Sequence, residues 1–241
     1  MKNLLFIIIC IAGGVYAVDH FKKTASDEDS DAASKLVVID DSHSELDIYY
    51  PQYGSIDLVC GIDSPEDDPD AIFCCAGAFT ATRLDEFKHT NINGNHVSGG
   101  KFHKGSAYSA ACFTWYDGNW TFSKKSDAEK ALKKAAEKGG MGFRQIALIL
   151  DGEKKNTSMT KSNLYRALCE LDGKLCVIES KTVIPMQDFI TELHDLGVTN
   201  AIYLDMGSWR HCWYRQSEGD SVTYLHNIIH DNYTNWLTFY K

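Results

Sequence analysis

The hydrophobic positions of this chain fall mainly in short runs bounded by turn residues, which is the pattern of β-strands. The dipeptides Asp117-Gly118 and Asp172-Gly173 each predict a two-residue hairpin turn. The Gly-, Asn- and His-rich segment from Thr90 to Gly105 is expected to be mostly loop. We expect strands at Leu36–Ile39, Ile48–Tyr50, Ser55–Cys60, Ala71–Cys75, Cys112–Tyr116, Trp120–Phe122, Ile146–Leu150, Leu164–Leu168, Leu175–Glu179, Asn200–Asp205 and Asn235–Tyr240.

Two segments instead show the three- and four-residue apolar spacing of a helix. The first spans Asp127–Lys138, where Ser126 and Glu129 form a capping-box pattern and Gly139 follows as a stop residue. The second begins near Pro185 and ends at Gly197. We therefore predict an α+β fold: a single domain with a mixed, mainly antiparallel sheet or sheets and a few flanking helices.

The amino-terminal residues are not expected to belong to this fold. Residues 1–17 combine Lys2, an apolar run and small residues before a cleavage position, which is typical of a secretory signal peptide. Residues 18–35 are acidic and poor in apolar side chains, which predicts a disordered tether. We expect an exported protein, periplasmic, cell-surface or secreted, whose domain covers 36–241 and whose mature chain has no integral membrane segment.

The net charge of the chain limits the classes of binding partner that we expect. The chain has 241 residues and a formal net charge of −9. A nucleic-acid backbone attracts the opposite sign, so no nucleic-acid partner is predicted. The acidic stretch Asp63–Asp70, which contains two prolines, is interpreted as a solvated loop, with a calcium loop as the alternative.

The cysteines indicate neither a zinc ribbon nor a disulfide miniprotein, because no CxxC pair occurs and the chain is long. The hairpin at Asp172-Gly173 places Cys169 opposite Cys176, with Cα atoms about 5.5 Å apart, which leaves both a disulfide and a pair of free thiols open. None of the cysteines has the setting of a reactive thiolate. No metal and no cofactor is predicted.

The strongest candidate for chemistry is Asp205, which ends an apolar strand and is followed by Met206-Gly207-Ser208-Trp209. Ligand clefts form at the ends of central strands, and Gly207 permits a close backbone approach. The alternative is that Asp205 only hydrogen-bonds the turn that follows it.

Three further features could serve a ligand or the core. Trp209 and Arg210 begin an aromatic and basic stretch that suits a sugar ring and an anion, or forms an ordinary amphipathic strand. Arg166 lies in an apolar strand, where it needs an anionic partner unless it points into solvent. His96 belongs to a glycine–histidine segment that is interpreted as a surface loop rather than a metal site.

Four segments occur in one order over about residues 71–240: Cys75-Ala76-Gly77-Ala78-Phe79-Thr80, Ile92-Asn93-Gly94-Asn95-His96, Tyr165-Arg166-Ala167-Leu168 and Asn200–Ser208. Together they resemble the phosphodiester glycosidase domain, found in the lysosomal mannose 6-phosphate uncovering enzyme and its bacterial relatives. The chain looks most similar to a branch of exported proteins from gut Bacteroidetes.

The resemblance implies hydrolysis of a sugar from a sugar phosphodiester or phosphorylated glycan. Asp205 would be the catalytic acid, base or electrostatic stabiliser. The residues that would bind substrate are Gly77, Phe79, His96, Arg166, Gly207, Ser208, Trp209 and Arg210.

Two departures from the family pattern put turnover in question. Ala76 stands where the family has an asparagine, and Met206 shortens its glycine run. The rival hypotheses are therefore a non-catalytic glycan-binding module and a structural cell-envelope module on the same fold.

Overall fold

Most of the predicted apolar runs form strands in the computed structural model, which describes residues 35–61, 63–80, 92–105, 108, 110–206, 210–228 and 234–241. The predicted signal peptide and nearly all of the predicted tether lie outside the described residues. The described elements belong to one compact unit, Leu36–Lys241. Its strands are β1 (Val37–Asp40), β2 (Leu46–Pro51), β3 (Ser55–Gly61), β4 (Ala71–Ala76), β5 (His96–Ser98), β6 (Lys101–His103), β7 (Ala111–Tyr116), β8 (Asn119–Ser123), β9 (Met141–Gln145), β10 (Ala147–Leu150), β11 (Glu153–Lys154), β12 (Ser162–Asn163), β13 (Arg166–Leu171), β14 (Lys174–Ser180), β15 (Ile184–Pro185), β16 (Asn200–Leu204), β17 (Cys212–Tyr214), β18 (Thr223–His226) and β19 (Thr234–Tyr240), and its helices are α2 (Ala128–Glu137) and α3 (Met186–Asp195).

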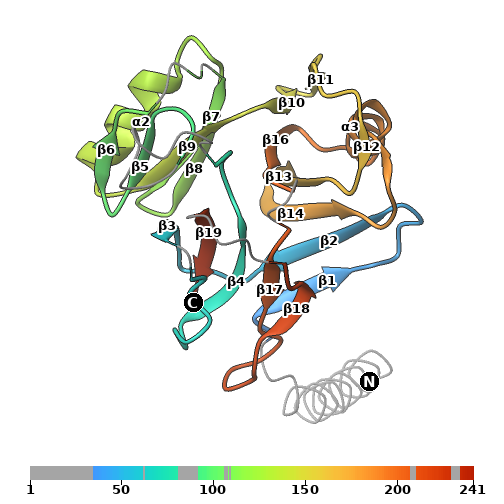
Figure 1. Ribbon diagram of the computed structural model, residues 1–241, viewed down its shortest axis with the longest axis horizontal. Helices are drawn as coiled ribbons and strands as arrows, with labels where there is room; N and C mark the ends of the chain where they lie inside the picture. The colour runs from blue at the N-terminus through green and yellow to red at the C-terminus, as the bar shows by residue number, and fades with distance from the viewer. Residues whose placement is uncertain are drawn as a thin grey trace, which may run out of the picture. The chain divides into compact units, whose positions relative to one another are not determined.

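The predicted α+β class is wrong: the described residues form a mainly β structure with two short helices (Figure 1). Their strand pairs are antiparallel throughout, so the predicted mixed pairing is also wrong. Part of the error lies in the glycine–histidine segment, which forms the β5–β6 hairpin. Its turn residues Gly99 and Gly100 have φ of 54° and 69°, as a tight hairpin turn requires.

Three of the four sheets formed by the described residues surround the main apolar core, and the fourth is the short pair β12-β15. The seven-stranded sheet has the order β1-β2-β14-β13-β16-β10-β11, and the five-stranded sheets have the orders β18-β17-β4-β19-β3 and β6-β5-β9-β7-β8. One face of the first sheet packs on the other two through buried side chains such as Leu168, Phe73 and Phe143. This sheet-on-sheet arrangement buries one face of each sheet without needing helices.

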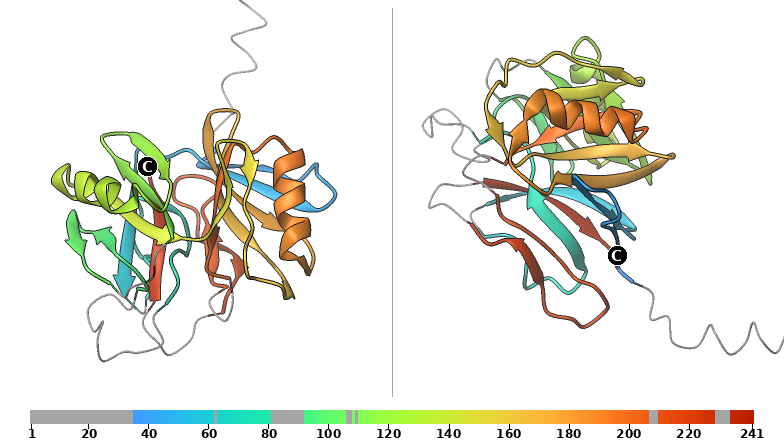
Figure 2. Two further views of the ribbon diagram at one scale, coloured as in Figure 1. Left: turned by 90° about the horizontal axis from the view of Figure 1, so that it is seen from above. Right: turned by 90° about the vertical axis from the view of Figure 1, so that its right-hand side faces the viewer.

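Each helix covers a separate part of this framework. Met186, Phe189, Ile190 and Leu193 of α3 pack on the other face of the seven-stranded sheet, across which the helix lies in Figure 2, right. Ala128 and Leu132 of α2 pack on the sheet that contains β5 and β7. The two predicted helices are thus confirmed, and Gly197, with φ of 95°, follows the end of α3.

Local predictions had mixed outcomes. Cys169 does oppose Cys176 across β13 and β14, and both are free thiols. The predicted hairpin at Asp117-Gly118 joins β7 to β8. The capping box at Ser126 is wrong, since the Ser126 hydroxyl donates to the Asp127 carboxylate instead of capping α2.

No helix among the described residues is long and apolar enough to cross a membrane.

Candidate functional site

Asp205 lies where the central strand β16 meets the turn at Gly77–Thr80. The residue is buried, with 6% of its surface exposed. Its backbone N–H donates to the Gly77 carbonyl at 2.9 Å, and its Oδ2 accepts from the Thr80 N–H at 3.4 Å. The predicted catalytic carboxylate therefore sits at a strand end, as expected, and the turn that it bonds is the one at Gly77–Thr80 rather than the turn that follows it.

The turn beside Asp205 is held rigidly from its other side by Asn235. The Asn235 side chain accepts from the Ala78 N–H at 2.7 Å and donates to the Ala78 carbonyl at 2.9 Å. A Cβ atom at Gly77 would lie only 3.0 Å from Asn235 Oδ1 and 3.2 Å from a methyl of Leu58. A larger residue at position 77 would therefore require Asn235 or Leu58 to shift.

Aromatic rings form one wall around Asp205. Phe79 packs against Tyr203 and Tyr108, with ring centroids 5.5 Å and 5.9 Å away. Burial, and then the negative charge of Asp205, raise the pKa of Tyr108 to about 12. The Tyr203 hydroxyl accepts from the Met206 N–H at 3.0 Å, which fixes the start of the turn after β16. The site thus combines one carboxylate with neutral phenols.

Arg144 is a buried cation close to Tyr108. It is 6% exposed, and its Nη1 donates to the Ala110 carbonyl at 3.1 Å. A Cβ at Gly94 would touch both Arg144 and Tyr108, so these two side chains flank the Gly94 turn.

Arg166 is enclosed rather than open to a ligand. Its exposed fraction is 0%, and its guanidinium bonds Glu179 Oε2 at 2.8 Å from Nε and 2.7 Å from Nη2. Arg166 opposes Leu204 in the register of β13 and β16, so these two side chains share the face that packs on the main core. Asp205 is the next residue in the chain, and Tyr203 and Phe79 pack on the opposite face of the sheet.

Glu179 links Arg166 to the surface. Burial raises the pKa of Glu179, but the charges of Arg166 and His226 outweigh burial, so this pKa is lower than usual. His226 Nε2 contacts Glu179 Oε1, and both residues line a hollow of about 200 Å³. Arg166, Glu179 and His226 thus form a row of ionisable side chains that begins in the core and reaches solvent at His226.

His96 is buried in β5 and does not face open solvent. Its Nδ1 lies 3.1 Å from the Gly94 carbonyl, and its ring stacks on His103 with centroids 5.0 Å apart. Burial lowers the pKa of His96 to about 4, so the ring is neutral at neutral pH. Its link to the candidate site is indirect, through the Gly94 turn.

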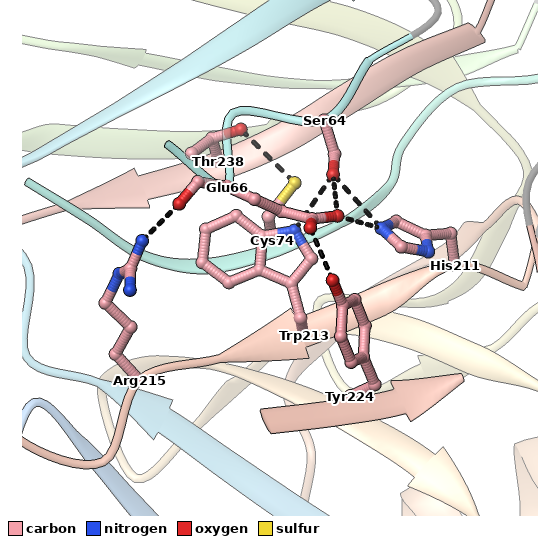
Figure 3. Close-up of polar contacts among 8 residues, drawn as sticks. All are labelled: Ser64, Glu66, Cys74, His211, Trp213, Arg215, Tyr224 and Thr238. Atoms are coloured by element: carbon pink, nitrogen blue, oxygen red, sulfur yellow. Dashed lines mark hydrogen bonds and ion pairs between the residues drawn. The ribbon is translucent and has the colours of Figure 1, made fainter. Parts of the chain in front are cut away.

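The aromatic and basic stretch that begins near Arg210 mostly serves the fold (Figure 3). His211 Nε2 bonds Glu66 Oε1 at 2.9 Å and Ser64 Oγ at 3.0 Å, while Trp213 donates to Ser64 Oγ at 3.1 Å. Arg215 lies over the Trp213 ring at 5.6 Å and donates to the Glu66 carbonyl. The loop at Asp63–Asp70, interpreted from sequence as a solvated loop, is thereby tied to β17.

Arg210 itself is partly exposed, whereas Gly207, Ser208 and Trp209 lie outside the described residues.

Within the described residues, no group of three or more His, Cys, Asp or Glu side chains is placed to hold a metal ion.

Sequence reasoning missed Tyr108, Arg144, Glu179, His226 and Asn235. For Glu179 a signal existed, because the Asp172-Gly173 turn register pairs it with Arg166. For Asn235 and Tyr108 none existed, since their partners are distant in the chain.

No family model and no curated protein matches this chain. Solved structures do match, and they define the class of fold. The catalytic domain of zebrafish N-acetylglucosamine-1-phosphodiester alpha-N-acetylglucosaminidase, auto-inhibited by its pro-peptide, aligns with a TM-score of 0.57 and 15% identity, over 86% of this chain and 81% of that one. A hypothetical protein from Synechocystis aligns with a TM-score of 0.52 and 11% identity, over 86% of this chain and 61% of that one. The fold is therefore phosphodiester-glycosidase-like, and identities this low show the fold alone.

Proposed function

We propose that this chain is an exported phosphodiester-glycosidase-like hydrolase that releases a sugar from a sugar phosphodiester or phosphorylated glycan. The observation that carries the proposal is the position of Asp205, a buried carboxylate at the end of a central strand in a fold similar to that catalytic domain. The carbohydrate partner and the export are inferred from the family resemblance and the amino-terminal sequence.

The reaction assigns a clear task to Asp205. Water attacks the anomeric carbon, the bond to the bridging oxygen breaks, and the products are a free sugar and a phosphomonoester. A phosphomonoester leaves readily, so the greater need is to activate the water and to stabilise the positive charge that develops on the sugar ring. A carboxylate enclosed by Phe79, Tyr108 and Tyr203 suits both tasks, because its charge is poorly screened by solvent there.

The phosphate needs a cation with an open face. Arg166 and Arg210 were the two predicted candidates, and their exposure differs: Arg166 is fully enclosed with Glu179, whereas Arg210 is partly exposed. We therefore assign phosphate binding to Arg210. Arg166 then stabilises the strand pair on which the site is built.

The test is hydrolysis of defined sugar phosphodiesters. We would incubate residues 18–241 with UDP-N-acetylglucosamine and with the methyl phosphodiester of N-acetylglucosamine 1-phosphate, and measure free sugar. Asp205→Asn keeps the size of the side chain and should lower the rate at least 100-fold, the scale of a lost acid–base group. Asp117→Asn, in an exposed hairpin turn, is the matched control and should hydrolyse at the wild-type rate.

A second candidate function is glycan binding without turnover, which the enclosure of Arg166 and the hydrogen bond from Thr80 to Asp205 favour. It predicts no free sugar from the wild type. It also predicts the same affinity for the phosphodiester in wild type and in Asp205→Asn, measured by calorimetry.

A further inference from the structure

A broad hollow lies at the far end of the seven-stranded sheet from Asp205. It measures about 710 Å³, within the range of ligand sites. Tyr50 comes from β2, Tyr53 from the segment after β2, and Lys174 from the start of β14. Trp120 of β8 closes the hollow from a different sheet. Three aromatic side chains from two separate stretches of the chain thus line one open cavity.

A second hollow of about 390 Å³ continues from the same tryptophan. It is lined by Trp120 and Phe122 of β8 and by Glu170 and Asn200 of the seven-stranded sheet. Asn200 Nδ2 donates to Glu170 Oε2 at 2.8 Å, which holds both polar groups in place. Trp120 lines both hollows, so they are neighbours that meet at this side chain, and we call the pair the Trp120 groove.

The chemistry of the Trp120 groove fits a carbohydrate chain. Aromatic rings pack on the apolar faces of pyranose rings, while carboxylates and amides bond their hydroxyl groups. The groove offers the rings of Trp120 and Tyr53 together with Glu170 and Asn200. Asp40 and Lys174 carry opposite charges, so the first hollow does not select an anionic ligand. An extended, uncharged ligand fits this mixture better than a phosphate or a basic peptide.

The groove is separate from the candidate catalytic site. Asn200 begins β16, and Asp205 follows the end of that strand. Five residues of strand correspond to about 17 Å, and Glu170 is likewise at the opposite end of β13 from Arg166. A ligand in the groove would therefore not occupy the surroundings of Asp205.

We propose that the Trp120 groove binds a linear, uncharged oligosaccharide. This proposal does not depend on hydrolysis at Asp205. It adds a second point of attachment for a glycan chain, in which Trp120 provides the central stacking surface.

The experiment measures binding of cellohexaose, chitohexaose and mannohexaose to residues 18–241 by calorimetry and tryptophan fluorescence. We expect at least one of the three to bind. Trp120→Ala should weaken that binding about tenfold, the scale of one aromatic contact, while Trp120→Phe retains most of it. Tyr53→Ala is the second variant and should also weaken binding if Trp120→Ala does not fold.

The controls separate this groove from the candidate catalytic site. Asp205→Asn and Val183→Ser, an exposed position outside the groove, should bind the hexasaccharide as wild type does. The proposal is overturned if none of the three sugars binds when present at about 10 mM, a concentration at which even a very weak complex would form. It is also overturned if folded Trp120→Ala and Tyr53→Ala bind normally, or if Asp205→Asn alone abolishes binding.

Discussion

Two charged clusters in this protein contain the same pair of groups, a carboxylate and a histidine, in different surroundings. Glu179 lies between sheets, with Arg166 on one side and His226 on the other. Glu66 lies in a surface loop and bonds His211 and Tyr224. The Glu179 side chain is 9% exposed and its partner Arg166 is 0% exposed, whereas the Glu66 side chain is 27% exposed.

The comparison shows that burial decides how much a charged cluster contributes to the stability of the fold. Removing one partner of an enclosed ion pair leaves a charge without compensation in a medium of low polarity. Removing one partner near the surface lets water take its place, so the loss is smaller. Both clusters join distant segments, yet only the first is expected to be essential for folding.

The largest effect is expected from Glu179→Gln. The Arg166 guanidinium would lose its counterion inside the core, and the free energy of unfolding should fall by about 3–5 kcal/mol. Urea unfolding of wild type and variant measures this directly. A loss below about 1 kcal/mol would contradict the role assigned to the pair.

The pH dependence of the free energy of unfolding provides a second test of Glu179. Because the pKa of Glu179 is lowered in the fold, its contribution is present above the ordinary glutamate pKa and is lost as the pH falls through the folded value. Glu179→Gln has no carboxylate to protonate at this position, so its free energy of unfolding should fall less steeply than that of the wild type as the pH is lowered.

An intermediate effect is expected from His96, a histidine whose pKa is lowered mainly by its burial. Its pKa is about 4 in the fold against 6.5 ordinarily, which corresponds to about 3 kcal/mol. Since the folded pKa is the lower one, this contribution is complete above pH 6.5 and is lost as the pH falls toward 4. Unfolding measured from pH 7 to 4 should show this loss in wild type and a flatter profile in His96→Gln. Equal slopes would show that His96 is already compensated.

The smallest effect is expected from Glu66→Gln. Glutamine retains one carbonyl oxygen to bond Ser64 and His211, but its amide NH2 replaces the oxygen that accepts from Tyr224, and the negative charge is lost. The free energy of unfolding should fall by about 1 kcal/mol, because the side chain is partly solvated. Thermal unfolding at pH 7 measures it, and a loss larger than that of Glu179→Gln would reverse the comparison.

Local patterns in the sequence predicted much of the fold. The Asp172-Gly173 turn determines a register, and that register correctly places Cys169 opposite Cys176. The same register pairs Arg166 with Glu179, a pairing that the sequence analysis missed. Apolar spacing correctly located both helices. The fold class was wrong because short hairpins such as β5–β6 contain glycine and histidine rather than apolar runs.

The candidate site was harder to predict because its contacts join distant parts of the chain. Asp205 could be located from the end of an apolar strand. The bonds between Asn235 and Ala78 join residues 157 apart, and no local pattern encodes them. The enclosure of Arg166 likewise depends on how two sheets pack.

The position of β19 has a consequence for how the protein is made. The last strand of the chain lies between β4 and β3, pairing with both. Until the ribosome has released residues 234–240, β3 and β4 have no common neighbour, and the Gly77 turn lacks its Asn235 contact. Such pairing between remote segments slows folding. We therefore expect nascent chains that end before β19 to remain open and sensitive to protease, and completed chains to become resistant in one late step.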